Sequence, residues 1–332
     1  MKRILLTITL LAIAVWAVLP AGAQRGLTIT LGTVVPEGSA WHQTLKQMEQ
    51  DWARISGGRV RLRIMAGGRL GDDIEMLRLM RIGRLQALAL TGIGLARMDE
   101  GVDAMHIPLL FRSYEELDYV RDKMAPTLEK RLASNGFVIL NWSDGGWAHF
   151  FAKQPVATLA DLRKQKLWIS AGDPKTERLY KKFDMQVTPL ALGDVQTGLQ
   201  TGLVEVVTEP PLFAMLDGTY QAAGNMTDLR WAPVLGGTVI SKDAWEKIPA
   251  DLRPQLEEAS RKAGDDLRAT IRKLGADAIT QMKSRGLNVV EVDRAAWEKE
   301  VTALYPQLRG DLAPADLFDM AIRYRDEYRA KQ

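Results

Sequence analysis

Residues 59–92 read RVRLRIMAGGRLGDDIEMLRLMRIGRLQALALTG. The stretch begins with arginines that alternate with apolar residues, which predicts a β-strand with one solvated face; a basic ligand-binding stripe is the alternative. Gly71-Asp72-Asp73 then marks the start of a helix that ends near Gly83. The apolar run LQALALTG predicts a second strand. Strand, helix and strand in this order predict a parallel α/β sheet.

The alternation continues in both directions from this stretch. We expect strands at 27–36, 137–144 and 285–293, helices at 39–58, 113–136, 175–182 and 193–202, and long amphipathic helices after Ala244. A mature chain of about 300 residues usually forms two domains, and no low-complexity linker separates them. The sequence therefore predicts two α/β lobes joined by several chain crossings, with a hinge and a cleft.

The N-terminus has the pattern of a cleavable export signal. Lys2 and Arg3 precede an uncharged apolar run to Val18 and the small-residue site Ala21-Gly22-Ala23. We predict that residues 1–23 are a signal peptide, cleaved after Ala23, and that the mature protein is periplasmic. The alternative, a membrane anchor, needs a longer apolar run.

Composition excludes several classes of protein. The chain has no cysteine, which rules out thiol catalysis, disulfides and a lipid anchor on an N-terminal cysteine. Loss of Lys2 and Arg3 with the signal lowers the net charge to about +1. A net charge this small lacks the excess of basic residues that nucleic-acid-binding proteins carry.

Catalytic and cofactor motifs are missing from the sequence. The three histidines, His42, His106 and His149, are far apart, and no nucleotide-binding or hydrolase motif occurs. Asp72, Asp73 and Glu75 could hold a metal, but acidic residues at a helix start more often cap it. We expect no enzyme activity, no cofactor and no metal site.

The order of motifs resembles the extracytoplasmic solute receptors of TRAP transporters, the DctP-like P subunits. The resemblance covers most of the mature chain, through ISGGRVRLRIMAGGRLGDDIEMLRLMRIGRLQALALTG, HIPLLFRSYEEL, GFVILNWSDGGW, TLADLRKQKLWI, PLALGDVQTGLQTGLVE and GGTVISKDAWEKIPADLRPQLEEAS. Each motif alone has modest specificity, and their shared order makes the match strong.

The resemblance implies an α/β, two-lobed periplasmic binding protein-like fold with a hinge, crossing strands and a central ligand cleft. Lobe I would comprise 25–145 and 234–273, and lobe II 146–233 and 274–332. The implied partners are a small-molecule solute and the small and large permease subunits of a TRAP transporter; a periplasmic accessory protein is a further candidate.

The same resemblance locates the ligand site, where this chain departs from the family pattern. Two arginine positions, which in typical members bind a solute carboxylate, fall on Trp168 and Ala148, and an asparagine-type position falls on Thr208 or Glu209. Buried carboxylates need a cation, so we expect an apolar or neutral solute, or one that is not a simple carboxylate. Glu209 with an aromatic face also allows a cationic solute.

The remaining candidate ligand-binding residues are Trp147, Phe150, Ser170, Phe213, Trp41 and Gly92. Trp168 lies in a predicted strand, where Leu167 and Ile169 share the opposite face. Packing in a lobe core is the alternative for Trp168, as is helix packing for Trp41. Two other functions stay open: an exported receptor-like protein that has lost solute binding and docks a partner, and an organic-acid receptor that uses a different cation.

Overall fold

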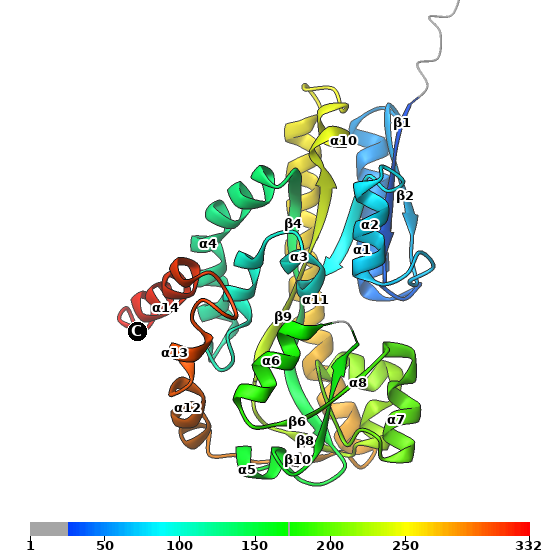
Figure 1. The fold of residues 1–332 in the computed structure, drawn as a ribbon. Coiled ribbons are helices and arrows are strands. Elements are labelled where there is room, and N and C mark those ends of the chain that lie inside the picture. The colour runs from blue at the N-terminus through cyan, green and yellow to red at the C-terminus, as the bar shows by residue number, and fades with distance from the viewer. Residues whose placement is uncertain (1–25, 172) are drawn as a thin grey trace, which may run out of the picture.

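The computed structural model describes residues 26–171 and 173–332. The predicted signal peptide, 1–23, lies outside the described residues. Figure 1 shows an elongated molecule with an upper and a lower lobe. Among the described residues, no helix is both long and apolar enough to span a membrane.

A ten-stranded sheet in the order β2-β1-β3-β9-β4-β7-β5-β6 runs through both lobes; β8 also pairs with β4, and β10 pairs with β8. Lobe I contains β1 (Leu27–Thr33), β2 (Val60–Met65) and β3 (Ala87–Thr91). Lobe II contains β5 (Lys166–Ser170), β6 (Gln186–Leu190), β7 (Val206–Glu209), β8 (Asn225–Thr227) and β10 (Asn288–Val290). β1 is parallel to β2 and β3, and β5 is parallel to β6 and β7. The predicted parallel α/β arrangement is therefore confirmed in each lobe.

Two long antiparallel strands, β4 (Phe137–Ala152) and β9 (Ala232–Ser241), connect the lobes. β9 pairs with β3 of lobe I, and β4 pairs with β7 and β8 of lobe II. The register of β4 against β9 shifts twice, between Ile139 and Asn141 and between Asp144 and Gly146. Such bulges bend a strand, which suits a segment that passes from one lobe to the other.

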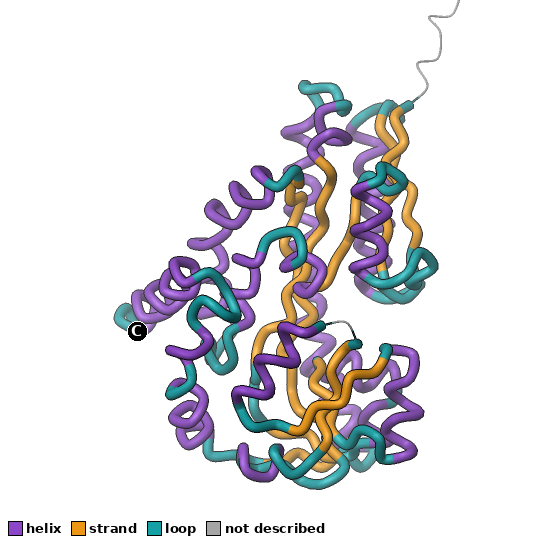
Figure 2. Tube along the Cα trace, viewed as in Figure 1, coloured by secondary structure: helices purple, strands orange, loops and turns teal. Residues whose placement is uncertain are grey.

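Helices cover both faces of the sheet (Figure 2). In lobe I they are α1 (Ala40–Ile55), α2 (Asp73–Arg81), α3 (Gly92–Ala96), the 3-10 helix η1 (Glu100–His106), α4 (Tyr114–Ser134) and α10 (Lys242–Glu246). In lobe II they are α5 (Leu159–Leu162), α6 (Pro174–Lys182), η2 (Leu192–Asp194), α7 (Val195–Thr201), α8 (Pro211–Asp217) and α9 (Thr219–Ala222). Ser39 and Asp72 cap α1 and α2, and no metal-binding acidic cluster exists in residues 26–171 and 173–332.

The C-terminal part of the chain joins the lobes a second time. α11 (Arg253–Ser284) packs against α1, β4 and α8, so this one helix contacts both lobes. α12 (Arg294–Thr302) places Trp297 against Phe150 of lobe II. α13 (Tyr305–Leu308) leads to α14 (Ala315–Arg329), which packs on α4 of lobe I. The C-terminal segment thus contacts both lobe II and lobe I. The residue limits of the two lobes stay a prediction.

Candidate ligand cleft

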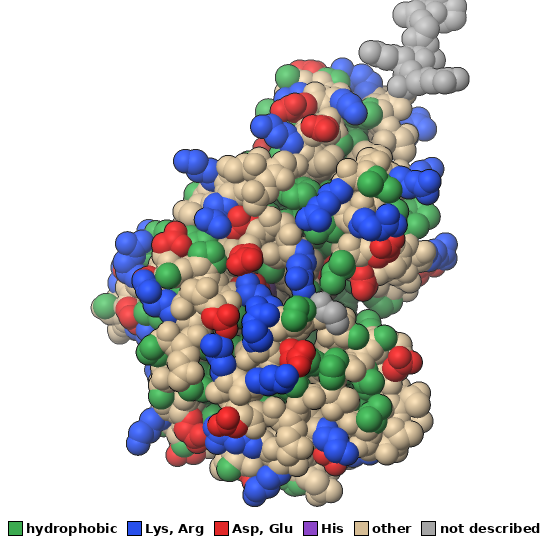
Figure 3. Space-filling model, in the orientation of Figure 1, with side chains coloured by type: hydrophobic (Ala, Val, Ile, Leu, Met, Phe, Trp, Pro, Cys, Tyr) green, Lys and Arg blue, Asp and Glu red, His purple; other side chains and the backbone are tan. Residues whose placement is uncertain are grey.

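The parallel strands of both lobes end at the gap between them (Figure 1). In open α/β sheets, ligands bind outside these carboxyl strand ends. Figure 3 shows a notch at this level, with hydrophobic side chains on both of its sides. Three exposed apolar residues follow strand ends or begin helices there: Ile74 in α2, Ile93 in α3 and Leu192 after β6. The cleft therefore has apolar rims on both lobes.

Trp168 lies on the face of β5 opposite to Leu167 and Ile169, as strand alternation predicts. Leu167 and Ile169 are buried, whereas Trp168 is half-buried against an apolar cluster that includes Phe151. Its indole Nε1 donates a hydrogen bond to the carbonyl oxygen of Leu190, at 3.1 Å. The indole is thereby held against β6, with part of its surface exposed.

Glu209 ends β7 on the same face as Trp168. Leu167 pairs with Val206 in parallel register, so Ser170 and Glu209 are at equal distances along β5 and β7. Glu209 also pairs directly with His149 of β4, whereas Thr208 pairs with Phe150 on the opposite face. The structure thus brings Trp168, Ser170 and Glu209 together at one edge of the sheet, and Thr208 points away from them.

No cation of residues 26–171 and 173–332 pairs with the carboxyl group of Glu209. Its Oε1 is buried and has no hydrogen-bond partner among the described residues. Burial, and then the negative charge of Asp217, raise the pKa of Glu209 to about 8, although a hydrogen bond with Thr219 opposes the shift. The neighbouring His149 is itself buried, which lowers its pKa, and its Nδ1 lies 3.1 Å from the carbonyl oxygen of Thr227. Burial therefore favours the neutral form of both Glu209 and His149.

The candidate residues of β4 occupy three different environments. Trp147 is buried against the ring of Tyr114, at 5.2 Å between centroids, and its Nε1 has no partner among the described residues. Ala148 pairs with Ala232 of β9, and its side chain is buried. Phe150 is fully buried, with the ring of Trp231 at 5.1 Å. The structure gives Phe150 a position in the aromatic core of lobe II.

Trp41 and Phe213 meet each other across the two lobes. Their ring centroids are 4.9 Å apart, although Trp41 begins α1 and Phe213 begins α8. The Nε1 of Trp41 donates to the carbonyl oxygen of Asp144 in β4, at 3.4 Å. The pair therefore connects the lobes beside the crossing strand.

Gly92 is buried where β3 passes into α3. A Cβ at this position would be 2.4 Å from the imidazole of His106. Only glycine fits beside this histidine without displacing it.

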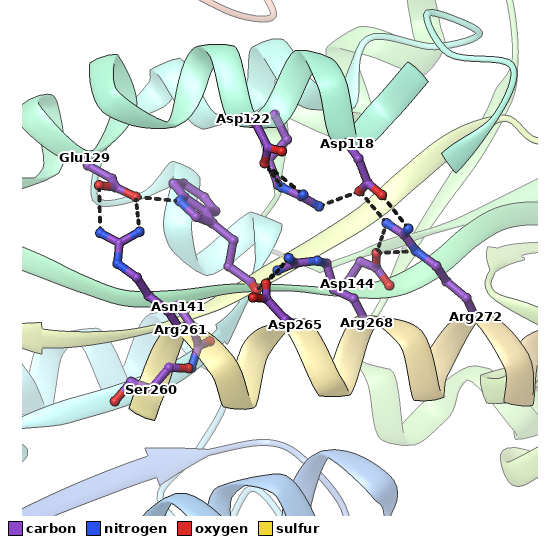
Figure 4. Close-up of polar contacts among 12 residues, drawn as sticks. Asp118, Asp122, Glu129, Asn141, Asp144, Ser260, Arg261, Asp265, Arg268 and Arg272 are labelled. Atoms are coloured by element: carbon purple, nitrogen blue, oxygen red, sulfur yellow. Dashed lines mark hydrogen bonds and ion pairs between the residues drawn. The ribbon is translucent and has the colours of Figure 1, made fainter. Parts of the chain in front are cut away.

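A cluster of charges around buried Asp144 at the strand crossing could not be inferred from the motifs (Figure 4). Arg272 of α11 binds Asp118 of α4 at 2.7 Å and Asp144 of β4 at 2.9 Å. Its guanidinium also lies 4.1 Å from the ring centroid of Tyr114. Desolvation raises the pKa of Asp144 despite Arg272, whereas the arginines around Asp118 lower the pKa of that group in spite of its partial burial. A hint in the sequence is the four-residue spacing of Gly264, Arg268 and Arg272, which puts them on one side of α11.

Arg230 is an exposed cation beside Ala148. The next residue, Trp231, donates its backbone N–H to the carbonyl oxygen of Ala148, at 2.9 Å. The guanidinium of Arg230 lies 5.9 Å from the ring centroid of Trp147 and donates to the carbonyl oxygen of Arg112. The chain thus has a cation next to a position where the resemblance implies one, but this cation comes from the loop between β8 and β9.

Known proteins resemble this chain in both sequence and structure. The chain is 23% identical over 296 residues to the C4-dicarboxylate-binding periplasmic protein DctP of Rhodobacter capsulatus, covering 87% of this chain and 88% of that protein. It is 22% identical over 305 residues to the sialic acid-binding periplasmic protein SiaP of Vibrio cholerae, covering 88% and 91%. A TRAP periplasmic solute-binding protein of Xanthobacter autotrophicus, solved with β-D-galacturonate, superposes with a TM-score of 0.82 at 21% identity, covering 90% and 99%.

A second solved structure, a TRAP periplasmic solute-binding protein of Chromohalobacter salexigens with bound D-glucuronate, also has a TM-score of 0.82, at 18% identity and covering 90% and 99%. These likenesses confirm the two-lobed fold that the motifs imply. The family model for bacterial extracellular solute-binding protein, family 7 (DctP), matches residues 31–311 of this chain. The chain therefore belongs to the DctP family of bacterial extracellular solute-binding proteins, which bind solutes and are not enzymes.

Proposed function

We propose that this protein is the periplasmic receptor of a TRAP-type uptake system. It would bind a small solute between its lobes, close around it and deliver it to the small and large permease subunits. The family and the two-lobed fold support this role. Closure of two lobes over a solute needs no reactive side chain, which fits the absence of a catalytic motif in the sequence.

We further propose that the solute is neutral or largely apolar where it meets lobe II. One observation carries this proposal: Glu209, on the same face of the sheet as Trp168, has a buried Oε1 without a partner among the described residues. A solute carboxylate placed there would lie beside a second carboxyl group without a cation, at a cost of several kcal/mol, on the order of that for an unpaired buried charge. A hydroxyl or amide group could instead satisfy Oε1, and the apolar rims would cover the rest of the solute.

A carboxylate solute is the second candidate, because relatives and structural neighbours carry acidic ligands in their names. Arg230 favours this candidate, since its guanidinium lies over Trp147 beside Ala148. In that arrangement the solute carboxylate would point toward β9 and away from Glu209. Replacement of Arg230 by methionine should then abolish binding of a carboxylate solute. The affinity for a neutral solute should stay unchanged.

The decisive experiment is mass spectrometry of the small molecules released from freshly purified, denatured protein. D-Galacturonate and the neutral D-galactose form a matched pair for thermal-shift measurements, because a ligand stabilises the form that binds it. Stabilisation by galacturonate that is lost in Arg230→Met would refute the neutral-solute proposal. Recovery of a neutral solute, with Arg230→Met unaffected, would support it. Failure to recover or bind any solute would favour a receptor-like protein that docks a partner.

A further inference from the structure

We propose that an ion-pair clasp, formed by Lys175 with Asp103 and by Asp173 with Arg97, joins the start of α6 in lobe II to α3 and η1 in lobe I and favours the closed receptor before any solute binds. This proposal rests on contacts between the lobes alone. It holds for any class of solute.

The first pair of the clasp is short and partly shielded. The Nζ of Lys175 lies 2.6 Å from Oδ2 of Asp103, and Glu100 provides a second carboxylate at 3.8 Å. The side chains of Lys175 and Asp103 are 22% and 13% exposed. Partial burial reduces the solvent screening that makes fully exposed ion pairs weak.

The second pair uses a carboxylate that is already fixed in place. Asp173 caps α6 by accepting hydrogen bonds from the backbone N–H of Thr176, at 3.3 Å, and from its hydroxyl, at 2.6 Å. The guanidinium of Arg97, at the end of α3, lies 3.7 Å from Oδ1 of Asp173. Asp173 therefore presents its charge to lobe I without the loss of side-chain entropy that a mobile carboxylate would suffer.

Both pairs connect elements that belong to different lobes. α6 packs on β6 of lobe II, whereas α3 packs on β3 of lobe I and on β9, and η1 packs on α3 and β9. Opening of the cleft must move these elements apart, and the contacts must break. By contrast, Lys181 pairs with Glu177 within α6, also at 2.6 Å, and that contact survives any movement between lobes.

A clasp of this kind changes the equilibrium between open and closed receptor. A contact present only in the closed state raises its population before solute arrives, and the apparent affinity for solute rises with the fraction of competent receptor. The effect is limited in size, because a partly exposed pair shifts a two-state equilibrium by about five-fold.

The test uses the mature protein, freed of solute by unfolding and refolding. The chain has no cysteine, so Arg81→Cys in lobe I and Thr201→Cys in lobe II carry two unique spin labels. Pulsed electron paramagnetic resonance should show that Lys175→Met lowers the ratio of closed to open receptor about five-fold. Lys181→Met is the matched control and should leave the distances unchanged. Lys175→Glu combined with Asp103→Lys should restore the closed fraction, because it reverses the pair.

Two results would overturn the clasp. Identical distance distributions for Lys175→Met and Lys181→Met would show that the contact has no influence on opening. A reversed pair that stays as open as Lys175→Glu alone would show that the loss came from some other property of the lysine.

Discussion

Glu209→Gln should remove the contribution that Glu209 makes to the pH dependence of stability. Burial keeps the Glu209 carboxyl group neutral up to a pKa of about 8, whereas in the unfolded chain it ionises near its ordinary value of 4.5. Between these two values the unfolded state releases the proton and the folded state retains it. The folded state therefore loses stability as pH rises through this window. Glutamine has nearly the same shape and cannot ionise.

The size of the effect follows from the two pKa values. Each unit of difference corresponds to about 1.4 kcal/mol, so the pH interval from 5 to 8 removes about 3 kcal/mol from the unfolding free energy of the wild type. The variant should lack this contribution. Its advantage over the wild type should be small at pH 5 and largest at pH 8, where the wild-type carboxyl begins to ionise inside the fold.

Urea unfolding at pH 5, 6, 7 and 8, followed by tryptophan fluorescence, measures the difference directly; the chain has nine tryptophans. Glu205→Gln is the control, since this glutamate also lies next to β7 and is partly exposed. Unfolding free energies that change with pH in parallel for the wild type and Glu209→Gln would refute the reasoning. The carboxyl group would then be ionised in the folded protein, and a cation or water near it would have to be sought.

Three further changes test other parts of the structure. Trp168→Ala should weaken binding of the co-purified solute by roughly 2 kcal/mol in calorimetry, as expected for an aromatic anchor; an unchanged affinity in a folded variant would mean that the indole only packs. Arg272→Met should lower the unfolding free energy in urea by about 3 kcal/mol, because it leaves buried Asp144 without its cation, and Asp144→Asn in the same chain should recover part of the loss. Gly92→Ala should cost about 2 kcal/mol in the same assay through its clash with His106, and His106→Ala should relieve it. A Gly92→Ala variant as stable as the wild type would show that the histidine moves freely.

Much of each lobe could be predicted from local patterns. Ser39 and Asp72 cap α1 and α2 as expected, because side-chain capping depends on residues a few positions away. The crossing strands could not be delimited in this way. The strand expected at 137–144 continues to Ala152, and β9 has no clear alternation since both of its faces are covered. The strand expected at 285–293 shortens to β10, Asn288–Val290.

In the candidate site, too, features set by nearby residues could be predicted, and contacts with distant residues could not. Alternation correctly placed Trp168 opposite Leu167 and Ile169, because it depends only on the strand. Whether a side chain contacts a neighbour from far along the chain depends on packing. The ring of Phe150 meets Trp231 and Trp297, and that of Trp41 meets Phe213. No local pattern contains those partners.

The order of the strands has a consequence for how the protein is made. Lobe I begins at the N-terminus, yet its β3 pairs with β9, so that Ala87 meets Ile240. A ribosome must therefore synthesise most of the chain before the first lobe can complete its sheet. Contacts between such distant residues also slow folding, because a long loop must close first. A chain that completes its sheet late stays unfolded for longer. Slow folding of this kind favours any export route that carries the chain through a membrane in the unfolded state.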